Sequence, residues 1–469
     1  MIANDTIVAL ATASGSGAIA VIRLSGKDAI NIGSKFFKSV SGKSLSGQKS
    51  HTVHLGHIVD EPRVIDEVLV TLFKDPHSYT GENVIEISCH GSIYIQQEII
   101  QLFLKNGCRM ANAGEFTLRA FLNGKLDLSQ AEAVADLISS DNEASHQIAM
   151  QQMRGGFSSE IAKLREELLN FASLIELELD FAEEDVEFAD RAQFRALIER
   201  IGMVLRRLID SFAVGNVLKN GIPVAIVGEP NVGKSTLLNA LLNEDRAIVS
   251  DIAGTTRDAI EDEISIGGIG FRFIDTAGIR DTKDVVESIG IKKTFEKIEQ
   301  AQVVLFLVSS VQLAGGSDAV EPFIIEIEKI KNKFPLKQIL VVLNKIDQIS
   351  DVELENLTTL LAPHAAHLIP ISAKTKVGIE QLTTTLLNLI NTGALRNNET
   401  IVTNSRHYDA LLKALEEIQK VKYGLESDLS GDLLAIDIRE ALYQFGLITG
   451  QVTNDELLGN IFANFCIGK

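Results

Sequence analysis

One eight-residue stretch, Gly228–Ser235, constrains the possible folds of this chain more than any other feature. It reads GEPNVGKS and fits the pattern G-x-x-x-x-G-K-[ST] of a phosphate-binding loop. The apolar run Pro223–Val227 before it predicts a buried strand, and the apolar spacing in Thr236–Leu242 predicts a helix. Because strand, glycine loop and helix are the context that this motif needs, we expect the loop N–H groups and the helix N-terminus to hold phosphate oxygens.

The residues of this loop predict a site for a nucleotide together with its metal ion. Gly228 and Gly233 let the backbone turn its N–H groups toward phosphates. Lys234 is expected to reach the β- and γ-phosphates, and the hydroxyl of Ser235, just before Thr236, is expected to ligate Mg²⁺. The alternative is a chance glycine turn, but all the fixed positions and both flanks agree with a phosphate-binding loop.

Charge and cysteine content limit the functions open to this chain. Its 469 residues are enough for roughly two to four domains. They include 63 acidic and 44 basic residues, a net charge of −19, which disfavours non-specific coating of nucleic acid or of an anionic membrane. Cys89, Cys108 and Cys466 show no paired spacing, which is typical of a reducing cytosol. With no signal peptide and no apolar run near the length of a membrane span, we expect a cytoplasmic location.

Changes in apolar patterning divide the chain into four segments. Residues 1–120 mix strand and helix patterns, and residues 121–215 are helical, with an interruption expected where Gly215 and Asn220-Gly221 lead into the strand before the phosphate-binding loop. Residues 216–385 alternate strands with helices, which is typical of a parallel sheet covered on both faces. Residues 386–469 return to helix. We therefore expect a multidomain protein of α/β plus α class, in which an α/β domain is inserted into a helical domain made of two segments.

The same periodicity places the individual elements. The expected strands are Ile7–Ala11, Ala18–Leu24, Val68–Phe73, Val84–Ser88, Pro223–Val227, Glu261–Ile266, Phe271–Ile274, Val303–Val308, Gln338–Leu343 and His367–Ile371. The expected helices are Ile93–Lys105, Leu128–Ser140, Asn142–Met153, Glu160–Leu179, Asp190–Phe212, Ser405–Lys422, Asp432–Phe445 and Asp455–Phe465.

Two motifs after later strands indicate that the nucleotide base is guanine. The run Asn344-Lys345-Ile346-Asp347 follows the strand Gln338–Leu343. The carboxylate of Asp347 can accept hydrogen bonds from the N1–H and the 2-amino group of guanine, whereas adenine offers neither donor and would leave the acid unpaired. The run Ser372-Ala373-Lys374 follows the next strand, and its backbone N–H can meet the guanine 6-oxygen. The sequence therefore predicts GTP as the bound nucleotide.

Two segments between these motifs are expected to respond to the γ-phosphate. In the run Asp275-Thr276-Ala277-Gly278, Asp275 can hold Mg²⁺ through water and the Gly278 N–H can contact the γ-phosphate. A threonine of Gly254-Thr255-Thr256-Arg257-Asp258 can complete the Mg²⁺ shell. Ile279 stands where small signalling GTPases carry the glutamine that orients water, so another group must take this role. Candidates are a monovalent cation near Asn231 and the carboxylate of Glu287, although spacing alone favours an exposed helix residue at Glu287.

Several further motifs are typical of one protein family. They are Ser78-Tyr79-Thr80-Gly81-Glu82, Asn112-Ala113-Gly114-Glu115-Phe116-Thr117, the run Arg119–Asp127 and the terminal Cys466-Ile467-Gly468-Lys469. Together with the phosphate-binding loop and the guanine motifs, they make essentially the whole chain resemble the MnmE (TrmE) family of tRNA-modification GTPases. The C-terminal Cys-x-Gly-Lys is a narrow signature of that family.

The resemblance implies an architecture and a set of partners. It implies an N-terminal folate-binding α/β domain, a helical domain in two segments and an inserted Ras-like P-loop GTPase domain. It also implies a homodimer joined through the N-terminal domains. With the FAD-containing partner MnmG (GidA), such a dimer would form a heterotetramer. This assembly would install a carboxymethylaminomethyl-type group at C5 of the tRNA wobble uridine, with 5,10-methylene- or 5-formyl-tetrahydrofolate as the folate.

The resemblance also assigns roles to matching residues. The folate is implied to lie against Arg23, Glu82 and Lys125, with Lys469 near the same site. Arg23 and Lys125 can pair with the folate glutamate tail, and Glu82 can accept from the amino-pterin ring, although each residue taken singly is as easily part of a surface ion pair. The implied metal and water sites are Ser235 and Thr256 for Mg²⁺, Asn231, Ser250, Ile252 and Thr255 for K⁺, and Glu287 for the attacking water.

Three functions fit these observations and differ in what they require of residues 1–120. The leading interpretation is a GTPase of tRNA wobble-uridine modification. A regulatory GTP switch in ribosome assembly is the alternative, but it would have no use for a folate pocket. A folate enzyme of small-molecule metabolism with a regulatory GTPase domain is the third. The role of Cys466 stays open between a nucleophile near a one-carbon donor and a small apolar packing residue.

Overall fold

The computed structural model describes residues 5–180, 190–242, 262–274, 295–314, 317–335, 337–389, 400–427, 429–463 and 465–468. The chain divides into two compact units. The first contains residues 1–135, 152–202 and 413–469, and the second contains residues 136–151 and 203–412. Each unit is therefore assembled from segments that are far apart in the sequence.

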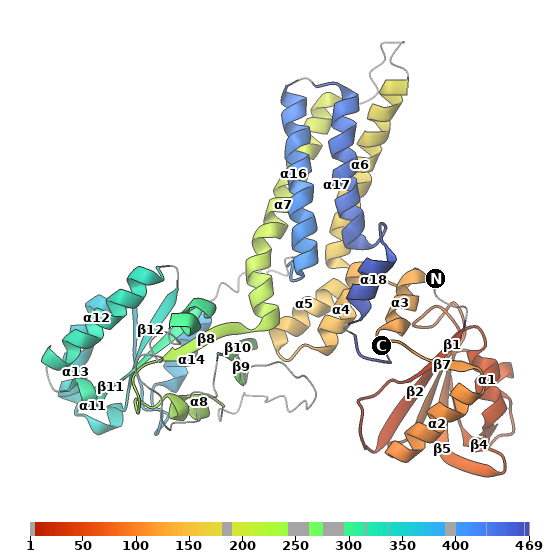
Figure 1. Ribbon diagram of the computed structural model, residues 1–469, viewed down its shortest axis with the longest axis horizontal. Helices are drawn as coiled ribbons and strands as arrows, with labels where there is room; N and C mark the ends of the chain where they lie inside the picture. The colour runs from red at the N-terminus through yellow and green to blue at the C-terminus, as the bar shows by residue number, and fades with distance from the viewer. Residues whose placement is uncertain are drawn as a thin grey trace. The chain divides into compact units, whose positions relative to one another are not determined.

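The first unit begins with a seven-stranded sheet in the order β3-β4-β5-β6-β2-β1-β7 (Figure 1). Its neighbouring strands are antiparallel except for the parallel pair of β1 with β7. Side chains alternate along β5, where Val68, Val70 and Leu72 are buried and Leu69 is exposed, so one face carries the core. The helices α1 and α2 supply Ile30, Phe103 and other residues to that core. The elements are β1 Thr6–Leu10, β2 Ile19–Ser25, α1 Ala29–Phe36, β3 Phe37–Ser39, β4 Thr52–Asp60, β5 Arg63–Phe73, β6 Val84–His90, α2 Ile93–Lys105 and β7 Cys108–Met110.

The four predicted strands and the predicted helix of this sheet domain are confirmed, whereas β3, β4, β7 and α1 were not predicted. The strand β4 lacks a clear hydrophobic signal because Val53 and Leu55 are exposed on it. It also contains Gly56, where an added Cβ would lie 2.4 Å from the Lys38 carbonyl oxygen, so a glycine is required by the close approach of β3.

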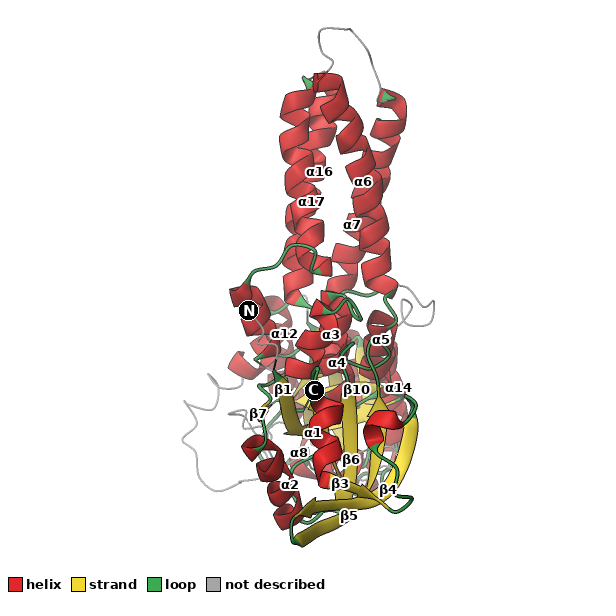
Figure 2. Ribbon diagram, turned by 90° about the vertical axis from the view of Figure 1, so that its right-hand side faces the viewer, coloured by secondary structure: helices red, strands yellow, loops and turns green. Residues whose placement is uncertain are grey.

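Helices from both ends of the helical region pack together in the first unit (Figures 1 and 2). Phe171 stacks on Phe194 at 5.2 Å between α6 and α7, and Arg439 of α17 pairs with Glu176 of α6 at 2.7 Å. No helix in the described part of the chain is both long enough and apolar enough to cross a membrane. The helices of this region, of which most of α5 and parts of α4, α7 and α16 belong to the second unit, are α3 Glu115–Leu122, α4 Leu128–Ile138, α5 Glu143–Met153, α6 Gly156–Asp180, α7 Arg191–Asn220, α16 Ser405–Glu426, α17 Gly431–Thr449 and α18 Asp455–Phe462.

The interruption expected at Asn220-Gly221 is confirmed, because α7 ends at Asn220, but the one expected at Gly215 is wrong, because α7 continues through it. A Cβ at Gly215 would lie 2.2 Å from the Val402 carbonyl oxygen, and the Val402 N–H donates to the Ser211 hydroxyl at 3.0 Å. The glycine is present because another chain segment crosses the helix there, and a packed contact of this kind outweighs the modest cost of glycine in a helix.

The second unit contains a six-stranded sheet in the order β13-β12-β11-β8-β10-β9, with β9 as its antiparallel edge. All seven residues of β11 are buried, as expected of a central parallel strand covered on both faces. One core includes Leu237 of α8 and Leu382 of α14, and the other includes Phe323 of α12 and Leu357 of α13. All six predicted strands are confirmed. The elements are β8 Ile222–Val227, α8 Lys234–Leu242, β9 Asp262–Ile266, β10 Ile269–Phe273, β11 Val303–Ser309, α11 Ser310–Leu313, α12 Ser317–Lys333, β12 Gln338–Asn344, α13 Asp351–Leu361, β13 His367–Pro370 and α14 Ile379–Asn388.

Candidate functional site

The predicted nucleotide motifs meet at one edge of the six-stranded sheet. The loop Gly228–Ser235 follows β8, Asn344 ends β12, and Ser372–Lys374 follow β13. These three strands are parallel members of the sheet, so their carboxyl ends lie on the same side. This is the edge at which open α/β sheets bind their ligands.

Two glycines of the phosphate-binding loop occupy positions that no other residue fits. Gly228 has φ +145°, and a Cβ there would lie 2.1 Å from the Leu307 carbonyl oxygen. Gly233 has φ +102°, and a Cβ there would lie 2.3 Å from the Asn344 side-chain nitrogen. The loop is therefore shaped against neighbouring strands, and both glycines are required by backbone conformation and by space.

Lys234 lies back across this loop. Its Nζ donates to the Gly228 carbonyl at 2.6 Å, and burial lowers its pKa, helped by the nearby charge of Lys297. Ser235 and Thr236 follow it in the first turn of α8, where the helix N-terminus adds a partial positive charge. The N–H groups of this turn suit an anionic phosphate, and its hydroxyl oxygens suit the metal that accompanies the phosphate.

Two residues of the guanine motif connect its loop to the phosphate-binding loop. The Asn344 side chain is buried, donates to the Val232 carbonyl at 2.8 Å and accepts from the Ala373 N–H at 3.0 Å. Lys345 has φ +66° and donates through Nζ to the Asn231 carbonyl at 2.6 Å. The two residues therefore cross-link three loops, which the motif alone did not predict.

The carboxylate expected to read guanine is exposed and oriented by a neighbouring hydroxyl. Ser372 Oγ donates to Asp347 Oδ1 at 2.6 Å and accepts from the Thr375 N–H at 3.2 Å. Ser372 and Ala373 are buried, whereas Lys374 is exposed on the same turn. The structure thus brings Asp347 together with the Ser372–Lys374 loop, as the sequence predicted.

The remaining predicted nucleotide and metal residues lie outside the described residues. They are Ser250, Ile252, Thr255, Thr256, Asp275, Gly278 and Glu287, and Lys469 of the predicted folate site also lies outside them.

A second polar site forms in the N-terminal sheet domain, where two sequence motifs pack against each other. The Tyr79 hydroxyl lies 2.8 Å from the Thr117 hydroxyl, and the Asn123 side chain donates to the Thr80 carbonyl at 2.7 Å. The side chain of Lys125 passes over Gly81, where an added Cβ would lie 3.2 Å from Lys125 Cε. Lys125 is thereby placed beside the loop that carries Glu82.

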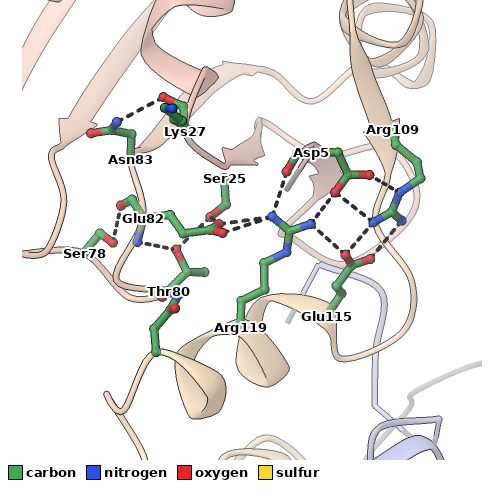
Figure 3. Close-up of polar contacts among 11 residues, drawn as sticks. Asp5, Ser25, Lys27, Ser78, Thr80, Glu82, Asn83, Arg109, Glu115 and Arg119 are labelled. Atoms are coloured by element: carbon green, nitrogen blue, oxygen red, sulfur yellow. Dashed lines mark hydrogen bonds and ion pairs between the residues drawn. The ribbon is translucent and has the colours of Figure 1, made fainter. Parts of the chain in front are cut away.

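The Glu82 carboxylate of this second site is held by two other side chains. It accepts from Ser25 Oγ at 2.7 Å and from Arg119 Nη1 at 3.2 Å to each of its oxygens. Figure 3 shows Arg119 between Glu82 on one side and a group of Asp5, Arg109 and Glu115 on the other. Arg119 Nη2 donates to Asp5 at 2.8 Å and to Glu115 at 2.9 Å. Glu82 therefore lies at the end of a connected ionic network.

Two carboxyl groups of this network have depressed pKa values. The hydrogen bond from Arg109 lowers the pKa of Asp5 below its usual value. Burial alone would raise the pKa of Glu115, but hydrogen bonds from Arg109, the Asn112 N–H and Arg119 outweigh it and lower that pKa. Both groups are therefore held in their charged form by the arginines.

Arg23, the third predicted folate residue, already has strong partners in the protein. It pairs with Glu86 across the β2–β6 register at 2.8 Å, and its guanidinium lies 5.7 Å and 5.5 Å from the ring centroids of Tyr79 and Phe116. Its Nη1 also donates to the Gly468 carbonyl at 3.3 Å. Arg23 thus links the N-terminal sheet to the C-terminal segment.

That C-terminal segment is docked on the N-terminal domain. Ile467 forms a β-bridge with Ala113, and the Cys466 carbonyl accepts from the Gly114 N–H at 3.4 Å. Gly468 has φ +98°, and a Cβ there would lie 2.1 Å from the Leu10 carbonyl oxygen. The exposed Cys466 is therefore held beside the second site, while the thiols of Cys89 and Cys108 are buried, which raises their pKa values to about 11 and about 12.

Sequence reasoning missed the residues that hold Glu82. Asp5, Ser25 and Arg119 come from β1, β2 and α3 or their flanks, and no spacing relates them. The available signal was that Glu115 and Arg119, which belong to two neighbouring motifs, lie one helical turn apart, a spacing that favours an ion pair at i, i+4.

The sheet order, the phosphate-binding loop and the guanine loop define a Ras-like P-loop GTPase domain, here accompanied by an N-terminal α/β domain and a helical domain. Two family descriptions match the chain, "GTP-binding protein TrmE N-terminus" over residues 6–125 and "MnmE helical domain" over residues 128–466.

Full-length relatives agree with these matches. Proteins named tRNA modification GTPase MnmE are 75% identical in Flavobacterium johnsoniae and 72% identical in Flavobacterium psychrophilum, each over 469 residues and 100% of both chains. One from Bacteroides thetaiotaomicron is 56% identical over 99% of this chain and 100% of its own. The chain belongs to the MnmE family of tRNA modification GTPases.

Proposed function

We propose that this GTPase uses GTP hydrolysis to drive the addition of a carboxymethylaminomethyl-type group at C5 of the tRNA wobble uridine. The one-carbon unit would come from a tetrahydrofolate, either 5,10-methylene- or 5-formyl-tetrahydrofolate. The observation that carries the proposal is the presence of two carboxylate sites in one chain, Asp347 beside the phosphate-binding loop and Glu82 in the N-terminal domain. A simple GTP switch needs only the first.

The residues present fit a GTP–Mg²⁺ complex. Gly228 and Gly233 place no Cβ at the two positions where it would meet a neighbouring strand or side chain, and Lys234 with the first turn of α8 offers donors to phosphate. Ser235 and Thr256 would hold Mg²⁺, which would neutralise charge on the phosphates. Asp275 would hold Mg²⁺ through water, and the Gly278 N–H would contact the γ-phosphate. Asp347, with the turn Ser372–Lys374, would select guanine.

K⁺ would supply the positive charge that an arginine finger provides in other GTPases. Its ligands would be Asn231, Ser250, Ile252 and Thr255, of which Asn231 has φ +63° in the phosphate-binding loop. Glu287 would orient the attacking water in place of the missing glutamine.

The donor and acceptor set of the N-terminal site fits a reduced folate. A carboxylate at Glu82 matches the adjacent N–H and amino donors of a pterin ring, and Tyr79 and Phe116 flank Arg23 beside it. Arg23, Lys125 and Lys469 would meet the anionic glutamate tail. The folate would supply the one-carbon unit, and the protein residues would bind and orient it.

Partners and domains follow from the family. The chain would act as a cytoplasmic homodimer joined through the N-terminal domains and would form a heterotetramer with the FAD-dependent MnmG. We assign residues 1–120 to the folate-binding domain, residues 121–215 and 386–469 to the helical domain, and residues 216–385 to the GTPase domain.

Mass spectrometry of tRNA nucleosides tests the modification. A strain that lacks this gene should lose the C5-substituted wobble uridine and regain it when the intact gene is restored, but not with an Asp347→Asn copy. An unchanged nucleoside profile in the deletion strain, with a ribosome-assembly defect instead, would overturn the proposal.

Turnover measurements in matched salts test the cation and Glu287. We expect the rate of GTP hydrolysis in K⁺ to exceed that in Na⁺ at equal ionic strength by at least about tenfold, because the smaller ion suits the cage poorly. Glu287→Ala should lower kcat while GTP affinity stays nearly unchanged, since its role exists mainly in the transition state. Equal rates in the two salts would exclude a role for K⁺ in hydrolysis. A normal kcat in Glu287→Ala would exclude a role for Glu287 in orienting water.

A further inference from the structure

We propose that Arg119 is a positioning residue that fixes the Glu82 carboxylate and thereby sets specificity for the amino group of a 2-amino-4-oxopyrimidine ring in the ligand. This inference rests on the proposed folate site. Arg119 itself touches no ligand, because it lies behind Glu82 with 2% of its side chain exposed, compared with 23% for Glu82.

The terminal nitrogens of the buried guanidinium are fully engaged. Nη1 donates to the Asp5 backbone carbonyl at 2.8 Å and to the Glu82 carboxylate at 3.2 Å. Nη2 donates to Asp5 Oδ1 at 2.8 Å and to Glu115 Oε1 at 2.9 Å. Four acceptors thus meet four N–H groups in the fixed plane of the fork, so the side chain has one favourable orientation.

The two acids that bind Arg119 on the side away from Glu82 are themselves held by a second arginine. Arg109 donates to Asp5 at 2.7 Å and to Glu115 at 2.6 Å, so Arg109 and Arg119 together balance the charges of those two acids. Glu82 is then the one carboxylate of this five-residue group without a matching arginine of its own. Its side chain faces a neutral, rigid ionic cluster on one side and is partly exposed on the other (Figure 3).

A chain of hydroxyl groups fixes the second oxygen of Glu82. Ser25 and Thr80 are fully buried. Ser25 Oγ lies 2.7 Å from Thr80 Oγ1 and 2.7 Å from Glu82 Oε2. A carboxylate only accepts, so Ser25 must donate to Glu82 and Thr80 must donate to Ser25. Thr80 Oγ1 then accepts from the Glu82 N–H at 3.3 Å, which closes the loop. Both carboxylate oxygens are therefore held in place from behind.

A carboxylate held from behind by donors presents its remaining lone pairs outward in a fixed direction. That array matches two adjacent N–H donors, such as the ring N–H and the 2-amino group of a 2-amino-4-oxopyrimidine ring. A ring that lacks the 2-amino group leaves one of these lone pairs unpaired, which is costly when the site closes around it. If the carboxylate were free to rotate, it would adapt to either ring and the discrimination would fall.

Calorimetric titration of the full-length protein with two probes tests this inference. The probes are 5-formyltetrahydrofolate and its 2-deamino-2-methyl analogue, and the readout is the ratio of their dissociation constants. We expect the intact protein to prefer 5-formyltetrahydrofolate by roughly tenfold to a hundredfold. Arg119→Lys, which keeps the charge but not the fork, should reduce that preference by about tenfold.

Arg109→Lys is the matched control. It makes the same chemical change in the same network but touches Asp5 and Glu115 rather than Glu82. If the network had a purely structural role, both variants would bind both probes more weakly, and the ratio of the two dissociation constants would stay unchanged. We expect the ratio to fall in Arg119→Lys and to be preserved in Arg109→Lys.

Glu82→Asp keeps the test decisive if Arg119→Lys does not fold. It leaves Arg119 paired with Asp5 and Glu115 and withdraws the carboxylate from the fork by one methylene, so the preference should fall although the charge is retained. A preserved preference in Glu82→Asp, or in a folded Arg119→Lys, would overturn the positioning role alone. Failure of the intact protein to bind 5-formyltetrahydrofolate would overturn the folate site as well.

Discussion

The two carboxylates of this chain are proposed to read the same kind of ligand edge, but the protein supports them by different means. Asp347 is exposed and takes a hydrogen bond from the neutral hydroxyl of Ser372. Glu82 takes one from the hydroxyl of Ser25 and is also held by the buried guanidinium of Arg119. In both cases the acid is proposed to meet an N–H and an amino group on adjacent ring atoms, in guanine and in a pterin.

The difference shows two ways of orienting an acid. At Asp347, backbone cross-links made by Asn344 and Lys345 fix the loops, and a single hydroxyl then suffices to orient the carboxylate. At Glu82, the support is an ionic network that spans Asp5 to Arg119, so it depends on the charge state of several acids. The nucleotide site should therefore be more sensitive than the N-terminal site to loss of its hydroxyl.

The largest effect is expected from Asp347→Asn. The amide offers one acceptor and one donor in place of two acceptors, so GTP affinity should fall by roughly a hundredfold or more. Xanthine nucleotides, whose 2-oxo group accepts from the amide, should gain affinity. Competition of GTP and XTP for the same protein measures both changes. A variant that keeps full preference for GTP would show that Asp347 does not read the base.

Ser372→Ala should have the next largest effect. The Asp347 carboxylate loses its hydroxyl donor, and loss of one hydrogen bond to a charged group corresponds to roughly tenfold weaker GTP binding. Equilibrium titration with GTP measures it, and titration with inorganic phosphate as a competitor should be unchanged because the phosphate-binding loop is untouched.

Ser25→Ala provides the matching change at the other site, and we expect a smaller effect. The Glu82 carboxylate keeps both contacts to Arg119, so 5-formyltetrahydrofolate should bind only about two- to threefold more weakly. If Ser25→Ala costs more affinity at its site than Ser372→Ala does at the nucleotide site, the contrast between ionic and hydroxyl support is wrong.

The smallest effect is expected on thermal stability at low pH. Asp5 and Glu115 have pKa values lowered from 3.8 and 4.5, so their contribution to stability is complete above those values and is lost as the pH falls through the lower folded-state pKa values. Glu115→Gln should lower the melting temperature at neutral pH, by roughly 2–4 °C for each kcal/mol lost, and its difference from the intact protein should shrink as the pH falls below 4.5 and through the lowered pKa of Glu115. A difference that stays constant with pH would exclude the titration of Glu115 as the cause.

Much of the fold was predictable because strong local patterns coincide with buried elements. Every strand expected in the GTPase domain is present, since fully buried parallel strands give continuous apolar runs such as Val303–Ser309. The weak signal of β4, whose apolar residues are partly exposed, and the helix that continues through Gly215 were missed. In both cases a contact with a distant segment, Lys38 or Val402, decided the outcome.

The candidate site was predictable where its residues form a motif of consecutive positions. The phosphate-binding loop and the guanine motif were placed correctly because each is a short run at a strand end. The network behind Glu82 was not predicted, because Asp5 and Arg119 are 114 positions apart and the ion pair depends on how β1 and α3 pack. Spacing along a sequence carries no information about such a pair.

The docking of residues 466–468 on the N-terminal domain has a consequence for the synthesis of the protein. Gly468 lies against Leu10 and accepts from Arg23, so the site near Glu82 includes residues made at nearly opposite times during translation. The N-terminal sheet leaves the ribosome early, but its site is finished only after residue 468 has been added. A product that stops within the GTPase domain would therefore lack the Gly468 carbonyl that accepts from Arg23 and the Ile467 bridge to Ala113.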